Sequence, residues 1–137
     1  MTRPIIELPA ALAGQVHDQA AAAHPGECCG LIEGLREGAV FHAVALHPAR
    51  NLAAEADRFD IDPRDHLAAA KAARANDHVI IGCYHSHPAG RAEPSARDLA
   101  GAGEEDFLWL IAAPAEITAF VYSCGGFVSV DCTISSG

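Results

Sequence analysis

The chain has 137 residues, a formal net charge of −9 at pH 7, and 50% hydrophobic residues. This length predicts one domain over residues 1–137 with a buried core, and the apolar content excludes an intrinsically disordered chain. Because nucleic-acid binding depends on Lys and Arg, an acidic chain without a basic cluster is not expected to bind nucleic acid.

No apolar run reaches the roughly 18 residues of a membrane span, so we expect no membrane insertion. Residues 1–7 lack the long apolar core of a secretion signal, and we therefore expect a cytoplasmic protein. The five cysteines are odd in number and contain no CxxC pair, which favours free thiols over disulfides or a cysteine-based zinc site.

Apolar and β-branched runs alternate with alanine-rich helical segments along the chain. The predicted strands cover residues 5–8, 27–33, 39–47, 79–84, 107–112, 117–124 and 127–134. The predicted helices cover residues 9–23, 63–76 and 95–103. We expect residues 5–8 to form an edge strand, residues 34–38 a hairpin loop, and Gly125-Gly126 a two-residue turn. This order predicts an α/β fold with a mixed, curved β-sheet flanked by helices.

The helix over residues 63–76 has the clearest boundary signals. Asp62 suits the N-cap, Pro63 the first helical position, and Arg74 the last turn. The polar stretch before it, residues 48–57, has no clear periodicity and predicts a loop beside a cleft.

Two histidines follow the predicted strand at residues 79–84. Because side chains alternate along a strand, His85 and His87 should leave the same face. Imidazole is a common zinc ligand, and Asp98 at the start of the next helix can supply a carboxylate. Three protein ligands would leave a tetrahedral ion one open position, as in catalytic zinc sites. The alternative is a surface His-X-His beside a capping box from Ser95 to Asp98.

The run His-Ser-His-Pro, six residues, then Ser-X-X-Asp resembles the signature of the JAMM (MPN-plus) metallopeptidases. That family also carries an upstream glutamate, and Glu27 in Glu-Cys-Cys-Gly-Leu is similar to it. The resemblance extends through Asn51, where related proteins have an asparagine that helps build the substrate groove, and through residues 58–63. A loop asparagine that closes a turn is the alternative for Asn51.

The resemblance implies the JAMM fold, whose architecture is similar to that of cytidine deaminases. The zinc deaminases themselves use His-X-Glu and Pro-Cys-X-X-Cys, and both are absent here. It also implies one Zn²⁺ per chain held by His85, His87 and Asp98. Glu27 would be the general base, and Ser95 would donate to the oxyanion.

The expected activity is zinc-dependent hydrolysis of an amide or isopeptide bond. The bacterial single-domain form resembles Mec-like peptidases, so the expected partner is the C-terminal Gly-Gly tail of a ubiquitin-like sulfur carrier. Such a tail could lie in a narrow groove beside the zinc and add to the sheet edge as a strand. A general small-peptide hydrolase, a non-catalytic MPN scaffold and a metal-storage protein are the alternatives; a monomer and a homodimer are both open.

Overall fold

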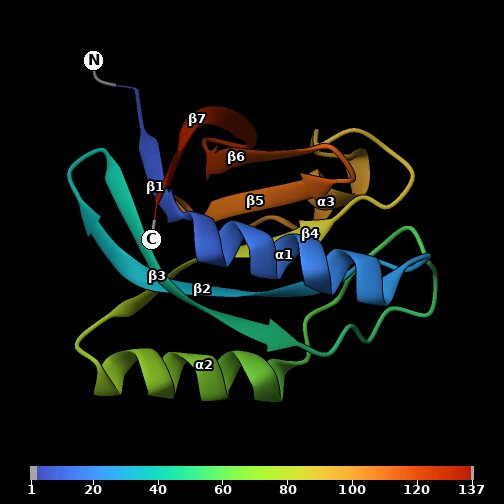
Figure 1. Cartoon of the computed structure of the whole chain (residues 1–137), viewed down its shortest axis with the longest axis horizontal. Helices are drawn as coiled ribbons and strands as arrows, with labels where there is room; N and C mark the ends of the chain where they lie inside the picture. The colour runs from blue at the N-terminus through green and yellow to red at the C-terminus, as the bar shows by residue number, and fades with distance from the viewer. Residues whose placement is uncertain (1–2, 137) are drawn as a thin grey trace.

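The computed structural model describes residues 3–136, which form three helices and seven strands (Figure 1). In chain order these are β1 (Ile5–Pro9), α1 (Ala10–Ala23), β2 (Cys29–Glu37), β3 (Val40–Ala49), α2 (Pro63–Ala75), β4 (Val79–Ser86), α3 (Ala96–Gly101), β5 (Leu108–Ala113), β6 (Glu116–Ser123) and β7 (Gly126–Ser135). The predicted α/β fold with a mixed sheet flanked by helices is confirmed.

The strands form one sheet in the order β1-β3-β2-β4-β5-β6-β7, which closes on itself. Strand β4 is central: it runs antiparallel to β2 and parallel to β5. Strand β1 pairs in parallel with both β3 and β7, so the prediction of residues 5–8 as an edge strand is wrong. The reason is burial: Ile6 and Leu8 are fully buried, and pairing on both sides satisfies the backbone around them.

Two hydrophobic clusters lie on opposite faces of the strands. On one face, Ile32 and Tyr84 pack with residues of α1 such as Val16. On the other face, Leu31 and Cys83 pack with Trp109 of β5 and with Ala69 of α2. Figure 1 shows α2 running along β2 and β3, and α1 crossing the strands elsewhere. Because side chains alternate along a strand, neighbouring residues of β2 and of β4 pack against different helices.

Two turns differ from the sequence-based prediction. Strand β2 continues through a bulge between Glu33 and Gly34 and ends at Glu37, so the β2–β3 turn is shorter than the predicted five-residue loop. The β6–β7 turn lies at Cys124 and Gly125, one residue earlier than predicted. Both turn residues have positive φ, 52° and 83°, which matches the twist of a tight hairpin.

Helix α2 begins as predicted. The Asp62 side chain accepts a hydrogen bond from the backbone N–H of Arg64 at 2.9 Å, and Pro63 opens the first turn. The first helix starts one residue later than predicted, at Ala10, and α3 ends two residues earlier, at Gly101.

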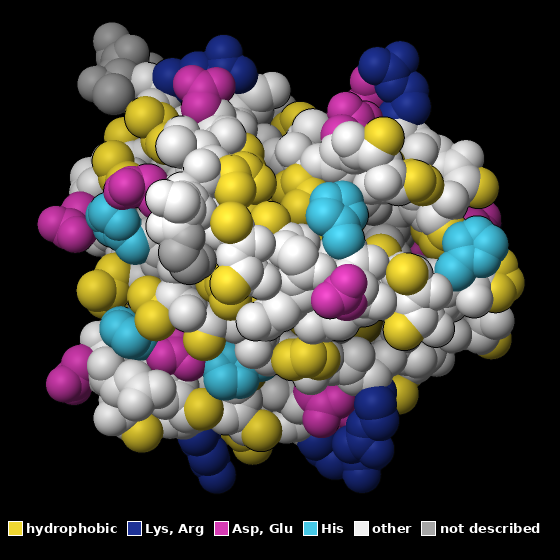
Figure 2. Space-filling model, viewed as in Figure 1, with side chains coloured by type: hydrophobic (Ala, Val, Ile, Leu, Met, Phe, Trp, Pro, Cys, Tyr) yellow, Lys and Arg dark blue, Asp and Glu magenta, His cyan; other side chains and the backbone are white. Residues whose placement is uncertain are grey.

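The surface carries its basic side chains in separate places. Figure 2 shows Lys and Arg side chains standing apart from one another at the rim of the face in view. Among residues 3–136, every helix is too short or too polar to cross a membrane.

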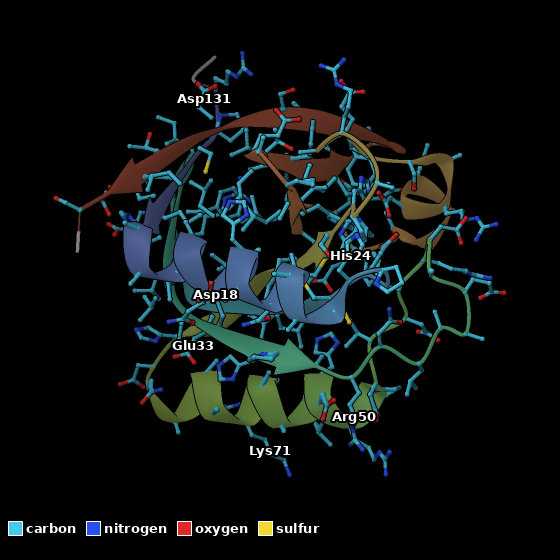
Figure 3. All side chains as sticks on the ribbon, turned by 45° about the vertical axis from the view of Figure 1, so that its right-hand side comes forward. Asp18, His24, Glu33, Arg50, Lys71 and Asp131 are labelled. Atoms are coloured by element: carbon cyan, nitrogen blue, oxygen red, sulfur yellow. The ribbon has the colours of Figure 1, made fainter. Side chains whose placement is uncertain are left out.

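A buried carboxylate joins the end of α2 to the sheet. Glu33 is 2% exposed and lies between the strands and α2 (Figure 3). Its Oε1 lies 2.8 Å from Nε2 of His47, and its Oε2 lies 2.6 Å from Nδ1 of His78 and 3.2 Å from Nδ2 of Asn76. Burial alone would raise the pKa of Glu33, but hydrogen bonds from His78, His47 and Asn76 outweigh it and lower the pKa.

We predict that Glu33→Gln lowers the free energy of unfolding by about 2 kcal/mol at pH 7, because hydrogen bonds to a buried charge are lost. A depressed carboxyl pKa stabilises the fold above the unfolded-state pKa, and this contribution disappears as pH falls through the native pKa. The deficit of the variant should therefore shrink below about pH 4. Urea unfolding at pH 7 and pH 3.5 measures it. Glu37→Gln, an exposed change on the same strand, is the control, and an equal effect of both variants would contradict the role of Glu33.

Candidate metal centre

The strand end and the helix start identified from the sequence meet in space. His85 lies on β4, His87 follows its last residue, and Asp98 lies in the first turn of α3. Strand β4 sits between β2 and β5, where His85 is opposite Cys29 on one side and Ile111 on the other. The histidines therefore project from the middle of the sheet.

Three side chains converge at this point. The Nε2 atoms of His85 and His87 are 3.1 Å apart. Asp98 Oδ1 lies 3.1 Å from Nε2 of His85, and Oδ2 lies 3.2 Å from Nε2 of His87. Tetrahedral coordination with bonds of about 2.0–2.1 Å separates ligand atoms by about 3.3 Å. The three side chains thus have the spacing and the nitrogen-oxygen donor set that suit a divalent cation such as zinc.

Burial and hydrogen bonding act differently on these groups. His85 is fully buried, and burial lowers its pKa. The hydrogen bond between His87 and Asp98 raises the pKa of His87. Burial alone would raise the pKa of Asp98, but hydrogen bonds from both histidines outweigh it and hold that pKa well below its usual range. A neutral His85 and an ionised Asp98 are the protonation states that a metal requires.

Glu27 joins the same cluster from another part of the chain. It lies two residues before the start of β2 and is 7% exposed, and one ligand atom each of Glu27, His85 and His87 lies within 4.8 Å of the other two. Burial raises the pKa of its carboxyl to about 7. Within residues 3–136, Glu27 Oε1 is buried without a hydrogen-bond partner. Such an orphaned oxygen has free capacity for a proton, a water molecule or a cation.

Both polar groups of the peptide bond that follows Glu27 are anchored by side chains. Asn51 Nδ2 donates to the Glu27 carbonyl at 3.1 Å, and Ser86 Oγ accepts from the backbone N–H of Cys28 at 2.9 Å. Ser86 is one of the residues that sequence reasoning missed as part of the site. The only available signal was its place between the two histidines, on the opposite face of β4.

Asn51 closes a turn, as the alternative interpretation predicted, and its part in a substrate groove stays a prediction. Its side chain closes the turn by accepting from the N–H groups of Ala53 and Asp60, both at 2.9 Å. Its amide also donates to the carbonyl of Arg58 at 3.1 Å, besides the bond to Glu27. Asn51 therefore ties the loop before α2 to the segment that carries Glu27.

Ser95 is the N-cap of α3. Its Oγ accepts from the backbone N–H of Asp98 at 3.0 Å, and its own N–H donates to Asp98 Oδ2 at 2.9 Å, which completes a capping box. The hydroxyl proton remains able to donate, because the cap uses only an oxygen lone pair. The cap also fixes the direction of the Asp98 carboxylate.

Two cavities adjoin the cluster. The smaller, about 560 Å³, includes Glu27, His87 and Ser95 among small residues such as Gly90 and Ala96. The larger, about 810 Å³, has aromatic and aliphatic walls and reaches Asp98; its apolar lining includes Leu31, Leu52, Phe59, Ile61, Phe107 and Trp109.

Arg97 lines both cavities and pairs with Asp57 at 3.1 Å, so this exposed ion pair joins α3 to the 51–61 loop across the cleft. Its position could not be read from the sequence, because the partners lie 40 residues apart.

The cysteines near the site are packed side chains. Cys83 is 3% exposed and belongs to the cluster with Leu31 and Trp109, and burial raises its pKa. Burial likewise raises the pKa of Cys29 to about 12 and raises that of Cys28. Thiols held neutral in this way are weak nucleophiles and weak metal ligands. Cys28 and Cys29 are therefore small buried hydrophobic residues and not reactive groups.

Comparison with known proteins gives one family match. Residues 9–123 match the model of the Prok-JAB family, described as prokaryotic homologs of the JAB domain. The chain is 32% identical to the desampylase of Haloferax volcanii over 91 residues, which cover 66% of this chain and 64% of that protein. It is also 32% identical to the desampylase of Pyrococcus furiosus over 85 residues, 62% of this chain and 58% of that one. The alignments thus span less than two thirds of these relatives.

Two solved structures resemble the fold closely. The solution structure of a Desulfitobacterium hafniense protein has a TM-score of 0.89 and 31% identity, covering 97% of this chain and 94% of that one. The solution structure of a Salinibacter ruber protein has a TM-score of 0.72 and 29% identity, covering 93% of this chain and 91% of that one. The closed sheet and its helices are therefore an arrangement found in other proteins.

Proposed function

Because the chain belongs to the family of prokaryotic JAB-domain homologues, as its resemblance to JAMM metallopeptidases suggested, we propose that it is a zinc-dependent metallopeptidase. The observation that carries the proposal is the convergence of His85, His87 and Asp98 beside Glu27. His85 Nε2, His87 Nε2 and an Asp98 carboxylate oxygen would hold one Zn²⁺ per chain. Glu27 would be the general base.

The orientation of His87 supports a ligand role. Its Nδ1 lies 2.9 Å from the carbonyl of Arg91, so Nδ1 carries a proton and donates it, and Nε2 can bind a metal once its own proton, shared with Asp98, is lost. This outer hydrogen bond is typical of metal-binding histidines. The alternative, a His-X-His on the protein surface, explains neither this hydrogen bond nor the burial of His85.

A bound zinc ion supplies a Lewis acid that lowers the pKa of water to about 7 and polarises a carbonyl group. The protein must then move protons at the right atoms. Glu27 has an oxygen without a hydrogen-bond partner within residues 3–136, so it can accept a proton from the water that attacks the amide carbon. The same carboxyl group can then give that proton to the leaving amine.

Ser95 would assist at the oxyanion. It lines the same cavity as Glu27 and His87, and its cap interaction leaves the hydroxyl proton free. A donor of this kind typically contributes about 3 kcal/mol to the transition state. Ser95 therefore acts as a helix cap and as an oxyanion donor in this proposal.

The proposed substrate is the C-terminal Gly-Gly tail of a ubiquitin-like protein, a sulfur carrier being the first candidate. The desampylase relatives support a ubiquitin-like modifier as the substrate class. The small residues around Glu27 and Ser95 support a tail without side chains. Addition of the tail as a strand remains part of the proposal, because β1 pairs with β3 only at residues 40–42 and the rest of β3 has β2 as its strand partner in the described residues. A general small-peptide hydrolase is the second candidate.

We predict one zinc per chain in the purified protein and almost none in His87→Ala, because removing one of three ligands destroys the site. Elemental analysis after dialysis measures the content. His42→Ala, on the outer part of β3 beside Glu7 and Glu37, is the matched control and should keep its zinc. Equal zinc in His87→Ala and the native protein would reject the ligand assignment.

We predict that Glu27→Gln keeps zinc but loses about 100-fold or more in kcat, since a neutral amide cannot accept a proton. Ser95→Ala should lose less, because it removes one donor, although it also costs about 1 kcal/mol of stability through the lost cap. Steady-state kinetics on zinc-loaded proteins measures both. Near-native kcat in Glu27→Gln would rule out its role as the base.

We predict cleavage after the Gly-Gly of a ubiquitin-like carrier that bears one further C-terminal residue, or a lysine side chain in isopeptide linkage. A carrier with valine at the penultimate position should react much more slowly, because its side chain does not fit beside the backbone. Mass spectrometry of the products distinguishes the cases. Equal rates for both carriers, or cleavage of unrelated peptides alone, would exclude this substrate class.

A further inference from the structure

The two histidines of the cluster are held in different ways. His87 has the outer hydrogen bond to the Arg91 carbonyl, whereas Nδ1 of His85 is buried and lacks a hydrogen-bond partner within residues 3–136. Metal-binding histidines almost always fix their ring through that second nitrogen. His85 must therefore be oriented by something else.

Aromatic rings surround His85. The Phe59 ring stacks on it with a centroid distance of 4.2 Å and an interplanar angle of 20°. Trp109 meets the edge of the same imidazole at 5.7 Å and 88°, and it also contacts Phe59 at 5.7 Å and 69°. Stacked and edge-to-face pairs at these distances are attractive and restrict the rotation of the rings.

We propose that Phe59 is the positioning residue of His85: its stacked ring replaces the outer hydrogen bond and holds Nε2 toward Asp98 and His87. The inference rests on the proposed zinc site. It concerns a loop residue that is not itself a ligand. Trp109 forms the second wall, and it comes from the neighbouring strand β5.

The loop that carries Phe59 is anchored so that the ring stays in place. Asn51 binds the backbone of the two residues flanking Phe59, accepting from Asp60 N–H and donating to the Arg58 carbonyl. An isolated bridge between Asn51 and Ile61 closes the same loop. Since Asn51 also binds the Glu27 carbonyl, one side chain aligns the segments of both Phe59 and Glu27.

The test is the zinc dissociation constant of folded, metal-free variants, measured by competition with a chelating dye. Phe59→Leu should raise the zinc dissociation constant about 10- to 100-fold, the usual effect of removing a residue that orients a metal ligand. Phe59→Tyr keeps a stackable ring and should bind zinc as the native protein does. The matched control is Phe127→Leu, which removes another ring in contact with Trp109, at 5.2 Å, in a different part of the fold.

A second readout separates positioning from general stability. The cobalt(II) form of Phe59→Leu should show an altered visible absorption spectrum, and that of Phe127→Leu should not. Unchanged zinc affinity and an unchanged cobalt spectrum in Phe59→Leu would overturn the proposal, as would equal weakening in Phe127→Leu. If Phe59→Leu does not fold, Phe59→Met takes its place under the same criteria. A native protein that binds no zinc would instead refute the proposed function.

Discussion

The meeting of Asp98 with His85 and His87 is the interaction on which the proposed site depends. It joins the end of β4, in the middle of the sheet, to the first turn of α3. The carboxylate is oriented by the capping box, in which the backbone N–H of Ser95 donates to it. The same bonds that start the helix thus direct an oxygen toward each imidazole. Without the helix start, the histidines would lose this carboxylate, and Glu27 would be the remaining acidic side chain of the cluster.

Two side chains of this cluster bury polar atoms at a cost in stability. In the part of the chain that the structure describes, the buried Glu27 Oε1 and His85 Nδ1 have no hydrogen-bond partner, and this costs free energy that other interactions must offset. The offset comes from the apolar clusters on both faces of the sheet, which hold β2 and β4 together. Departures of this kind are expected where function, and not stability, selects the residue.

Local spacing was enough to predict the positions of His85, His87, Ser95 and Asp98, because a strand period and one helical turn determine them. The helix at Pro63 was predictable for the same reason, since its cap and first turn are adjacent in the chain. Glu27 depended on family resemblance alone. Its burial and the orphaned oxygen arise only when β2 pairs with β4.

The contacts that sequence reasoning missed around the site and in the sheet closure are nonlocal. Ser86 supports the Glu27 segment across 58 residues, and the Arg97–Asp57 pair spans 40 residues. The stack of Phe59 on His85 likewise requires the 51–61 loop to fold over β4. Closure of the sheet through β1 and β7 joins residues near the two ends of the chain. Such contacts leave no periodic pattern in the sequence.

The most direct test of the account is zinc K-edge X-ray absorption on the purified, zinc-loaded protein. Binding by His85, His87 and Asp98 predicts a shell of nitrogen and oxygen atoms at about 2.0–2.1 Å, with the multiple scattering of two imidazoles. A sulfur atom at about 2.3 Å would contradict it, because the metal would then be bound by a cysteine such as Cys83 and not by the His85, His87 and Asp98 cluster.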